Sequence, residues 1–258
     1  MQETNFLQWL VLALIQGITE YLPISSSAHL ILISKVMGWK DQGLIMDIAA
    51  HGGSLFAVMW YFKSEIAKLF QGNNWKLFNQ LALASVPLAI IGYTFADFIE
   101  KNLRSPVVIA LSSIVFGLVL YLSDKIGKAM RQKPQDIGMK HALLIGLSQI
   151  CALIPGASRS GVTMSAAMAQ GFSRTKAAKF SFLLAIPALF MTTAYGVLKT
   201  VREPEEYNLI GVITVMIASF LSSWLSIKVF LNLIERISLS VFVWYRVILA
   251  ILILLLLR

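Results

Sequence analysis

Long apolar segments with very few charged residues are the feature that most limits how this chain can fold. Segments 77–99, 106–123 and 208–234 are each long enough to cross a bilayer, which requires about 20 apolar residues per helix. Only 14% of the 258 residues are Asp, Glu, Lys or Arg, and 57% are hydrophobic. Because soluble domains carry about 25% charged residues, most of this surface must face an apolar solvent. The sequence therefore predicts an all-α, polytopic membrane helix bundle that forms a single membrane domain over residues 1–258.

Other apolar segments are too short to cross and are interrupted by proline and serine. Segments 6–18, 28–38 and 161–171 belong to this group. Non-helical backbone is tolerated at membrane depth only where it is buried in protein or lines a water-filled cavity. The interruptions therefore predict two re-entrant, broken-helix hairpins beside a polar cavity.

Basic residues are concentrated in loops, which sets the expected orientation. Loops 63–76 and 124–140 are rich in Lys and Arg and are expected on the cytoplasmic side, whereas the mixed loops 97–104 and 199–207 are expected outside. The side of the N-terminus depends on whether the first segments cross or turn back. The net charge of +9 is explained by these basic loops, which orient the protein in the membrane. The chain lacks the interleaved aromatic and basic residues of a nucleic-acid groove, so nucleic acid is not an expected partner.

Two serine-rich interruptions resemble each other. LPISSS at 22–27 is similar to IPGASRS at 154–160, and each is followed by a short apolar piece and then a full span. The first of these spans ends at a basic loop and the second at the acidic loop 199–207. Similar pieces that point in opposite directions indicate an inverted-topology repeat, with a site near the midplane where the halves meet. The predicted halves are about 1–123 and 124–258.

The first interruption places six polar residues in apolar sequence: Gln16, Glu20, Ser25, Ser26, Ser27 and His29. Gln16 and Glu20 share one helix face, and Pro23 ends or kinks that helix. Glu20 is suited to bind a cation or act as a base, and His29 to transfer a proton or attack phosphorus. The serine hydroxyls and freed N–H groups can bind an anion. In the alternative interpretation, the serines only satisfy the broken backbone and His29 lies at the headgroups.

The second interruption contributes Gly156, Ser158, Arg159, Ser160, Gly161 and Thr163. The glycines let backbone approach a ligand closely, and the following helix start offers N–H donors and a partial positive charge. Arg159 is a rigid fork that matches two phosphate oxygens at once. The alternative is that Arg159 snorkels to the lipid headgroups.

Other polar residues have less certain roles. His51 and Asp47 lie either beside the cavity or in an interfacial turn, and Gln149 is expected to point inward. Arg246 is expected to snorkel or to pair rather than to react. No standard zinc, nucleotide or dinucleotide motif occurs, so no organic cofactor is expected. Glu20 is the candidate ligand for a divalent cation, Mg²⁺ or Ca²⁺.

Three segments carry a resemblance to a known family: QGITEYLPISSSAHL at 16–30, IPGASRSGVT at 154–163 and FSFLLAIP at 180–187. In order and spacing they resemble the undecaprenyl-pyrophosphate phosphatase family of bacteria, whose members confer bacitracin resistance. The resemblance covers essentially the whole chain. It implies an inverted repeat with two re-entrant hairpins in the bacterial plasma (inner) membrane. It also implies hydrolysis of undecaprenyl pyrophosphate to undecaprenyl phosphate and phosphate, which recycles the lipid carrier of cell-wall synthesis.

The resemblance also implies roles for individual residues. The family's acidic pair corresponds to Gln16 and Glu20, its serine to Ser26, its histidine to His29 and its arginine to Arg159. Because Gln16 cannot ionise, Glu20 is the only acid of the pair here. The expected catalytic residues are thus Glu20, Ser26, His29 and Arg159, and the nucleophile is His29, Ser26 or water. The expected substrate-binding residues are Gln16, Ser25, Ser27, Gly156, Ser158, Ser160, Gly161 and Thr163.

Further expectations concern orientation, assembly and alternative functions. The active site should open to the outer, periplasmic side, and a homodimer is a candidate assembly. A transporter or flippase of a phosphorylated lipid or small anion is the alternative function, because broken helices and inverted repeats also occur in transporters. The other integral lipid-phosphatase superfamily is disfavoured, because no histidine follows Ser158-Arg159.

Overall fold

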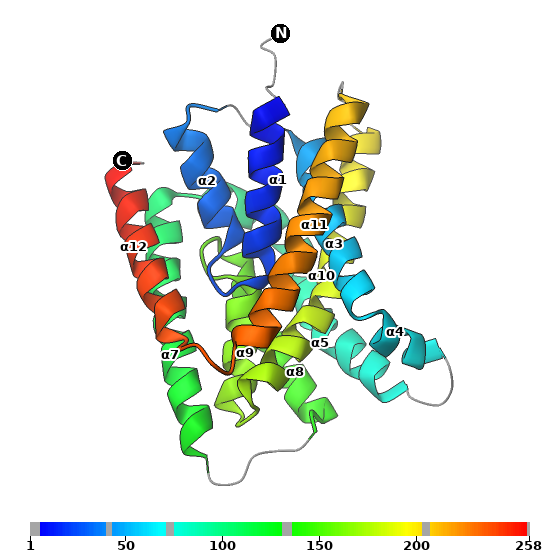
Figure 1. Cartoon of the computed structure of the whole chain (residues 1–258), viewed down its shortest axis with the longest axis vertical. Helices are drawn as coiled ribbons and strands as arrows, with labels where there is room; N and C mark the ends of the chain where they lie inside the picture. Colours follow the sequence, from blue (N-terminus) through cyan, green and yellow to red (C-terminus); the bar gives the residue numbers. More distant parts are fainter. Residues whose placement is uncertain (1–5, 40–42, 71–74, 131–135, 203–206, 257–258) are drawn as a thin grey trace.

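The computed structural model describes residues 6–39, 43–70, 75–130, 136–202 and 207–256, and within these ranges every regular element is a helix (Figure 1). The all-α prediction is confirmed. In chain order the elements are α1 (Phe6–Tyr21), α2 (Ser26–Val36), α3 (Leu44–Tyr61), α4 (Lys63–Phe70), α5 (Trp75–Thr94), α6 (Ala96–Asn102), α7 (Pro106–Ala129), α8 (Met139–Gln149), the 3₁₀ helix η1 (Ile150–Leu153), α9 (Arg159–Ala169), α10 (Arg174–Arg202), α11 (Leu209–Leu233) and α12 (Ser240–Leu256).

Five of the described helices are long and apolar enough to cross a membrane: α3, α5, α7, α10 and α11. Their outward side chains are largely apolar, as expected where lipid is the solvent. The prediction of a polytopic membrane bundle is confirmed by these spans. One predicted span, segment 77–99, ends earlier than expected: it is divided between α5, which ends at Thr94, and α6 rather than forming one helix.

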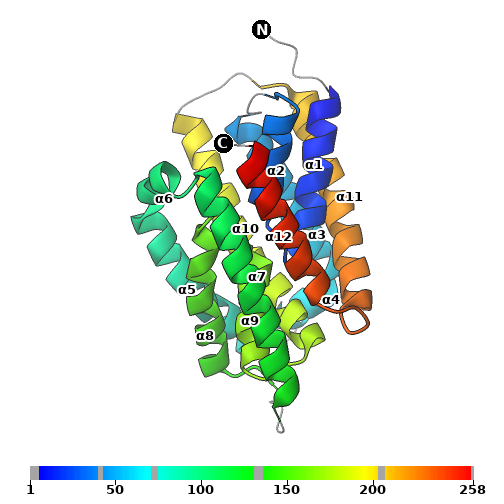
Figure 2. The same ribbon diagram turned by 90° about the vertical axis from the view of Figure 1, so that its left-hand side faces the viewer.

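The short apolar segments form two hairpins that enter the bundle from opposite ends. α1 and α2 lie in the upper half of Figures 1 and 2, and α8 and α9 lie in the lower half. Each pair is joined by an irregular break near mid-height, over residues 22–25 and 154–158. Opposed hairpins of this kind are what the predicted inverted repeat requires.

The two breaks also share a detail of backbone geometry. Ser25 and Ser158 are the non-glycine residues with positive φ in the described chain, at 71° and 69°, and each directly precedes a helix. Their hydroxyls lie 3.2 Å and 3.1 Å from those of Ser27 and Ser160, respectively. Such matched strain in non-glycine residues is uncommon. It supports the repeat, which remains a prediction.

Each hairpin packs against a span from the other half of the sequence. α1 contacts α11, and α8 contacts α5. α7 extends to Ala129, past residue 123, where the first predicted half ends. The interlocked halves place both breaks in the interior of one bundle.

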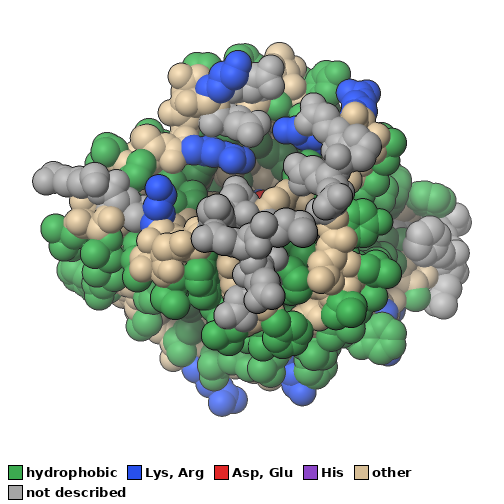
Figure 3. Space-filling view, turned by 90° about the horizontal axis from the view of Figure 1, so that it is seen from above, with side chains coloured by type: hydrophobic (Ala, Val, Ile, Leu, Met, Phe, Trp, Pro, Cys, Tyr) green, Lys and Arg blue, Asp and Glu red, His purple; other side chains and the backbone are tan. Residues whose placement is uncertain are grey.

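The ends of the bundle agree with the predicted grouping of loops. The adjoining ends of α7 and α8 lie at the lower end and α4 lies in the lower half, whereas α6 and the end of α10 lie in the upper half, where α1 begins (Figures 1 and 2). The first segments therefore turn back rather than cross. Lys and Arg side chains also occur on the upper face (Figure 3). The predicted orientation therefore depends on the concentration of basic residues in loops 63–76 and 124–140, and not on an absence of basic residues from the other side.

Close contact between α3 and α11 depends on small residues. A Cβ atom at Gly53 would lie 2.3 Å from the carbonyl oxygen of Met216, whereas one at Gly52 would meet nothing within 4 Å. Hydroxyls tie the same interface together, since Ser54 lies 3.0 Å from Ser219 and accepts from Ser223 at 2.9 Å. Small residues and interhelical hydrogen bonds are the usual means of association in lipid.

We expect Gly53→Ala to lower the melting temperature of the protein in detergent by several degrees, because the added methyl group forces α3 and α11 apart. Gly52→Ala is the matched control and should leave the melting temperature unchanged or raise it, since alanine is the better helix former. Equal melting temperatures for the two variants would contradict the α3–α11 contact.

Candidate active site

The segments around the first break bring two hydrogen-bond donors to Glu20. Its Oε2 accepts hydrogen bonds from Gln16 Nε2 at 2.9 Å and from Ser26 Oγ at 3.1 Å. Gln16 lies one turn earlier on α1, and Ser26 begins α2 after the chain has reversed at Pro23. The reversal therefore aims the Ser26 hydroxyl back at the carboxylate that precedes it.

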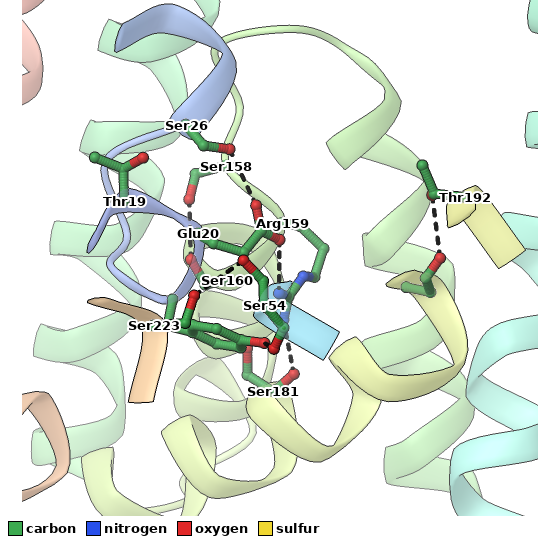
Figure 4. Close-up of polar contacts among 12 residues, drawn as sticks. Thr19, Glu20, Ser26, Ser54, Ser158, Arg159, Ser160, Ser181, Thr192 and Ser223 are labelled. Carbon is green, nitrogen blue, oxygen red and sulfur yellow. Dashed lines mark hydrogen bonds and ion pairs between the residues drawn. The ribbon is translucent and has the colours of Figure 1, made fainter. Parts of the chain in front are cut away.

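Arg159, at the start of α9, completes this cluster from the second break. Its Nη2 lies 3.1 Å from Glu20 Oε1, and its Nη1 donates to the Ser181 carbonyl at 2.9 Å (Figure 4). The guanidinium carbon lies 5.7 Å from the ring centre of buried Tyr21. The side chains of Arg159 and Glu20 are only 12% and 9% exposed. Arg159 is thus held inside the bundle rather than extended to the headgroups.

The two breaks are in direct contact. The hydroxyl of Ser160 donates to the Leu22 carbonyl at 2.8 Å, and that of Ser158 reaches the same oxygen at 3.4 Å. Ser158 also caps α9 by accepting from the Gly161 N–H. α2 has no such cap, because the Ser25 side chain accepts no hydrogen bond from a backbone N–H of the first turn. The two interruptions therefore form one site, as their resemblance suggested.

A cavity of about 240 Å³ opens over this contact. Six of the expected site residues line it, from both breaks: Glu20, Ser25, Ser26, Ser27, Ser158 and Arg159. Much of the remaining wall is apolar and comes from α5, η1, the second break and α10: Leu88, Ala152, Leu153, Ile154, Ala188 and Leu189. A polar cluster beside an apolar wall suits a ligand with a charged head and an apolar tail.

Three lining residues were missed or left undecided by the sequence. Thr19 and Thr192 line the cavity but sit in ordinary apolar helix sequence, which gave no signal. His51 lines it too, and its Nδ1 lies 2.8 Å from the Asp47 carbonyl. A carbonyl only accepts, so Nδ1 carries the proton and Nε2 is the ring nitrogen left for a ligand.

His29 does not line the cavity. Its Nδ1 donates to the Ser25 carbonyl at 2.6 Å, and its Nε2 lies 2.6 Å from the Tyr245 hydroxyl. Both ring nitrogens are therefore engaged, and the side chain is buried. The structure places His29 behind the first break, where it holds the backbone before Ser26.

The other expected binding residues also lie behind the cavity wall. Gln16 reaches the site only through Glu20. Thr163 bonds to the Ser181 hydroxyl at 2.7 Å. Gly156 has φ +95°, and a Cβ there would lie 2.1 Å from Ser112 Oγ, so this glycine allows the break to pack on α7. Ser160 contacts Leu22, and Gly161 lies against Arg246.

Two predictions about inward-facing residues have different outcomes. Gln149 is fully buried, as expected, although neither its Oε1 nor its Nε2 has a partner. Arg246 does not snorkel: it is completely buried and donates to backbone carbonyls of both breaks. The sequence could not show this, because the carbonyls it meets are far away along the chain.

The donor set bears on the expected divalent cation. Among the described residues, no group of three His, Cys, Asp or Glu side chains could hold a metal ion. Glu20 is a single carboxylate beside serine hydroxyls. This set fits Mg²⁺ in the manner of phosphate-transfer sites, where one or two carboxylates are supplemented by substrate phosphates and water.

Breaking the Glu20–Arg159 pair leaves one buried charge without a partner, which costs about 3–5 kcal/mol. We expect Glu20→Gln and Arg159→Gln each to lower stability, and the double variant to lose less than the sum, with a coupling of about 1 kcal/mol or more in denaturation experiments. The exposed pair Lys76–Asp136, separated by 3.8 Å, is the control. Its coupling should stay below about 1 kcal/mol. Additive losses at Glu20 and Arg159 would contradict the contact.

Comparison with known proteins identifies the family. The family described as bacitracin resistance protein BacA matches residues 9–252. An undecaprenyl-diphosphatase from Colwellia psychrerythraea is 44% identical over 95% of this chain and 96% of its own length. Those from Campylobacter curvus and Alcanivorax borkumensis are 42% and 44% identical, over 94% and 96% of this chain and 95% and 97% of their own lengths. The chain therefore belongs to the BacA family.

Proposed function

We propose that this protein hydrolyses undecaprenyl diphosphate to undecaprenyl phosphate and phosphate, and so recycles the lipid carrier of cell-wall synthesis. The observation that carries the proposal is the cluster of Ser26, Glu20 and Arg159 at the base of a cavity inside a membrane bundle. A hydroxyl, a carboxylate and a guanidinium are the groups needed to attack phosphorus and to stabilise phosphate charge. The full-length relatives that carry the diphosphatase name support the same activity.

Substrate binding follows from the charges at the two breaks. Arg159 offers the phosphate a planar pair of donors, although it must share them with Glu20 and the Ser181 carbonyl. The uncapped start of α2 presents N–H groups and the positive end of the helix dipole beside Ser26. The apolar cavity wall and the lipid then accommodate the polyprenyl chain.

Ser26 is the best-placed nucleophile. As its Oγ bonds to the terminal phosphorus, its proton passes to Glu20 Oε2, 3.1 Å away, and undecaprenyl phosphate leaves with the electron pair of the broken P–O bond. Water then attacks the phosphorus of the phosphoserine, the bond between Ser26 Oγ and phosphorus breaks, and Ser26 regains the proton from Glu20. Both protons of the water leave with the phosphate as H₂PO₄⁻. His29 acts through Ser25 as a positioning residue, since both of its nitrogens are engaged.

The expected divalent cation and the remaining expectations fit this scheme. Mg²⁺ or Ca²⁺ bound by Glu20 would neutralise phosphate charge, and no organic cofactor is needed. The cavity wall includes Leu88 of α5 and Thr192 of α10. Each lies in the C-terminal half of its helix, which is the half nearer the end opposite the basic loops. This supports a site that opens to the outer side of the bacterial plasma membrane. A homodimer remains a prediction.

We expect Ser26→Ala to lower kcat at least about 10²-fold, because the variant loses the hydroxyl that bonds to Glu20. Ser27→Ala is the comparison variant: its hydroxyl lines the same cavity but bonds to Ser25. Its effect should be smaller and fall mainly on KM. Rapid quenching of wild-type turnover should trap a phosphoserine that is absent from Ser26→Ala. Retained activity in Ser26→Ala would instead favour direct attack by water.

A transporter or flippase of a phosphorylated lipid is the alternative function, since broken helices serve transporters as well. The discriminating experiment gives purified protein in detergent undecaprenyl diphosphate and measures free phosphate. Hydrolysis predicts phosphate release that is lost in Arg159→Ala, by about 10³-fold. Absence of phosphate release from well-folded wild-type protein, with and without Mg²⁺ or Ca²⁺, would overturn the proposed function.

A further inference from the structure

Arg246 in α12 is a completely buried arginine that bonds to both breaks. Its Nη1 donates to the Pro23 carbonyl of the first break at 3.3 Å. Its Nη2 donates to the Gly156 and Ala157 carbonyls of the second break at 2.7 Å and 3.0 Å. Its Nε donates to the Ser113 carbonyl of α7 at 2.9 Å. One side chain therefore joins three segments that are distant in sequence.

The partners of Arg246 distinguish it from the other buried arginines. Arg159 pairs with Glu20 and Arg174 pairs with Asp124. In the part of the chain that the structure describes, no carboxylate lies within ion-pair distance of Arg246. A buried charge is costly in a membrane protein and usually marks a functional position. Here the cost of burying the charge is offset by hydrogen bonds to backbone carbonyl oxygens of the two breaks and of α7.

Two glycines make room for this side chain. An ideal Cβ at Gly161, in the first turn of α9, would lie 3.1 Å from Arg246 Nη1. A Cβ at Gly117, in α7, would lie 3.6 Å from its Cδ and Nε. The close approach at Gly161 explains why the motif that follows Arg159 contains a glycine that does not line the cavity.

The bonds to Arg246 also fix the direction of neighbouring N–H groups. In a planar trans peptide, C=O and N–H point in opposite directions, and the described chain has no cis peptide. Because the Ala157 carbonyl faces Arg246, the Ser158 N–H faces away from it. Ser158 lines the cavity and directly precedes Arg159. Arg246 thereby sets the orientation of the backbone that carries Arg159, the expected phosphate-binding residue.

The residue before Arg246, Tyr245, supports the first break through His29. The Tyr245 hydroxyl contacts His29 Nε2, and His29 Nδ1 holds the Ser25 carbonyl. By the same peptide geometry, the Ser26 N–H is turned away from His29. Adjacent residues of α12 thus restrain the backbone before Ser26 and the backbone before Arg159.

We propose that Arg246 is a positioning residue that aligns the two breaks, so that Ser26 and Arg159 reach the same phosphate group. The inference rests on the proposed phosphatase function. Arg246 touches no reacting atom; it acts through the carbonyls of Pro23, Gly156 and Ala157. Misplacement of a catalytic group by about 1 Å costs about 10²-fold in rate, which sets the scale of the expected effect.

The kinetic test compares Arg246→Met with Arg174→Met, both purified in detergent and normalised to the monodisperse, folded fraction. Arg174 is also buried and bonds to the Ile234 and Ile237 carbonyls. It is the first residue of α10, whereas the cavity is lined by the middle of that helix. Arg246→Met should lower kcat about 10²-fold with little change in KM, whereas Arg174→Met should keep the wild-type kcat per folded molecule. Wild-type kcat in folded Arg246→Met would overturn the proposal.

Milder variants cover the case in which Arg246→Met does not fold. Arg246→Lys keeps the charge but has one nitrogen and cannot reach all four carbonyls. Gly161→Ala keeps the arginine but crowds its guanidinium, and it also brings a methyl group 3.3 Å from the side chain of Ser158. Arg246→Lys and Gly161→Ala should each lower kcat at least about tenfold at nearly unchanged KM, because each displaces Ser26 or Arg159 slightly from the phosphate. Wild-type kcat in both variants would show that Arg246 is a structural residue only.

Hydrogen exchange gives a readout that does not depend on activity. In Arg246→Lys and Gly161→Ala, amide exchange should become faster in peptides covering 22–29 and 154–161 together, and it should not change there in Arg174→Met. If wild-type protein releases no phosphate, the proposed function fails, and the exchange data still decide whether Arg246 joins the breaks. Unchanged exchange at both breaks would overturn the inference.

Discussion

Backbone carbonyls that are exposed by two broken helices must find hydrogen-bond donors away from bulk water, and the rest of this bundle is arranged around that requirement. An unsatisfied carbonyl in an apolar interior costs several kcal/mol. The donors come from four other segments of the chain. Those that bond to break carbonyls are Arg246, His29, Ser112, Ser113, Ser158 and Ser160. The breaks are therefore defined by their surroundings rather than by local sequence alone.

The same hydrogen-bond donors determine which side of each break faces the cavity and which side packs against the other helices. With the carbonyls turned toward α7 and α12, the side chains of Glu20, Ser26 and Arg159 face the cavity. Glu20 and Arg159 are each largely buried, and each neutralises the charge of the other. In the proposed mechanism a phosphate would compete with Glu20 for Arg159, which would link substrate binding to the release of the carboxylate for proton transfer.

Much of the fold and the centre of the site could be predicted from the sequence. The hydropathy pattern predicted the spans, and proline with clustered serine predicted the breaks. Residues of the breaks that are charged or hydroxylic, such as Glu20, Ser26 and Arg159, were found because polar groups at membrane depth need a reason to be there. The prediction was weaker for His29 and Gly161, which have the right residue type but lie behind the cavity wall. It missed Thr19 and Thr192, because a threonine in a membrane helix usually bonds to its own backbone, as both do here.

The sequence by itself determined that the chain is a membrane bundle with two polar breaks, because hydropathy and proline act locally and can be recognised along the chain. It also predicted that the breaks carry phosphate chemistry, through residue types and their resemblance to a family. Only the tertiary structure decided which polar residues face the cavity and which support it. Arg246 illustrates the reason: its partners are carbonyl oxygens of Pro23, Gly156 and Ala157, and carbonyls are present in every residue, so no sequence pattern marks them. The role of such a side chain is set by packing between distant segments, which exists only after the helices have assembled.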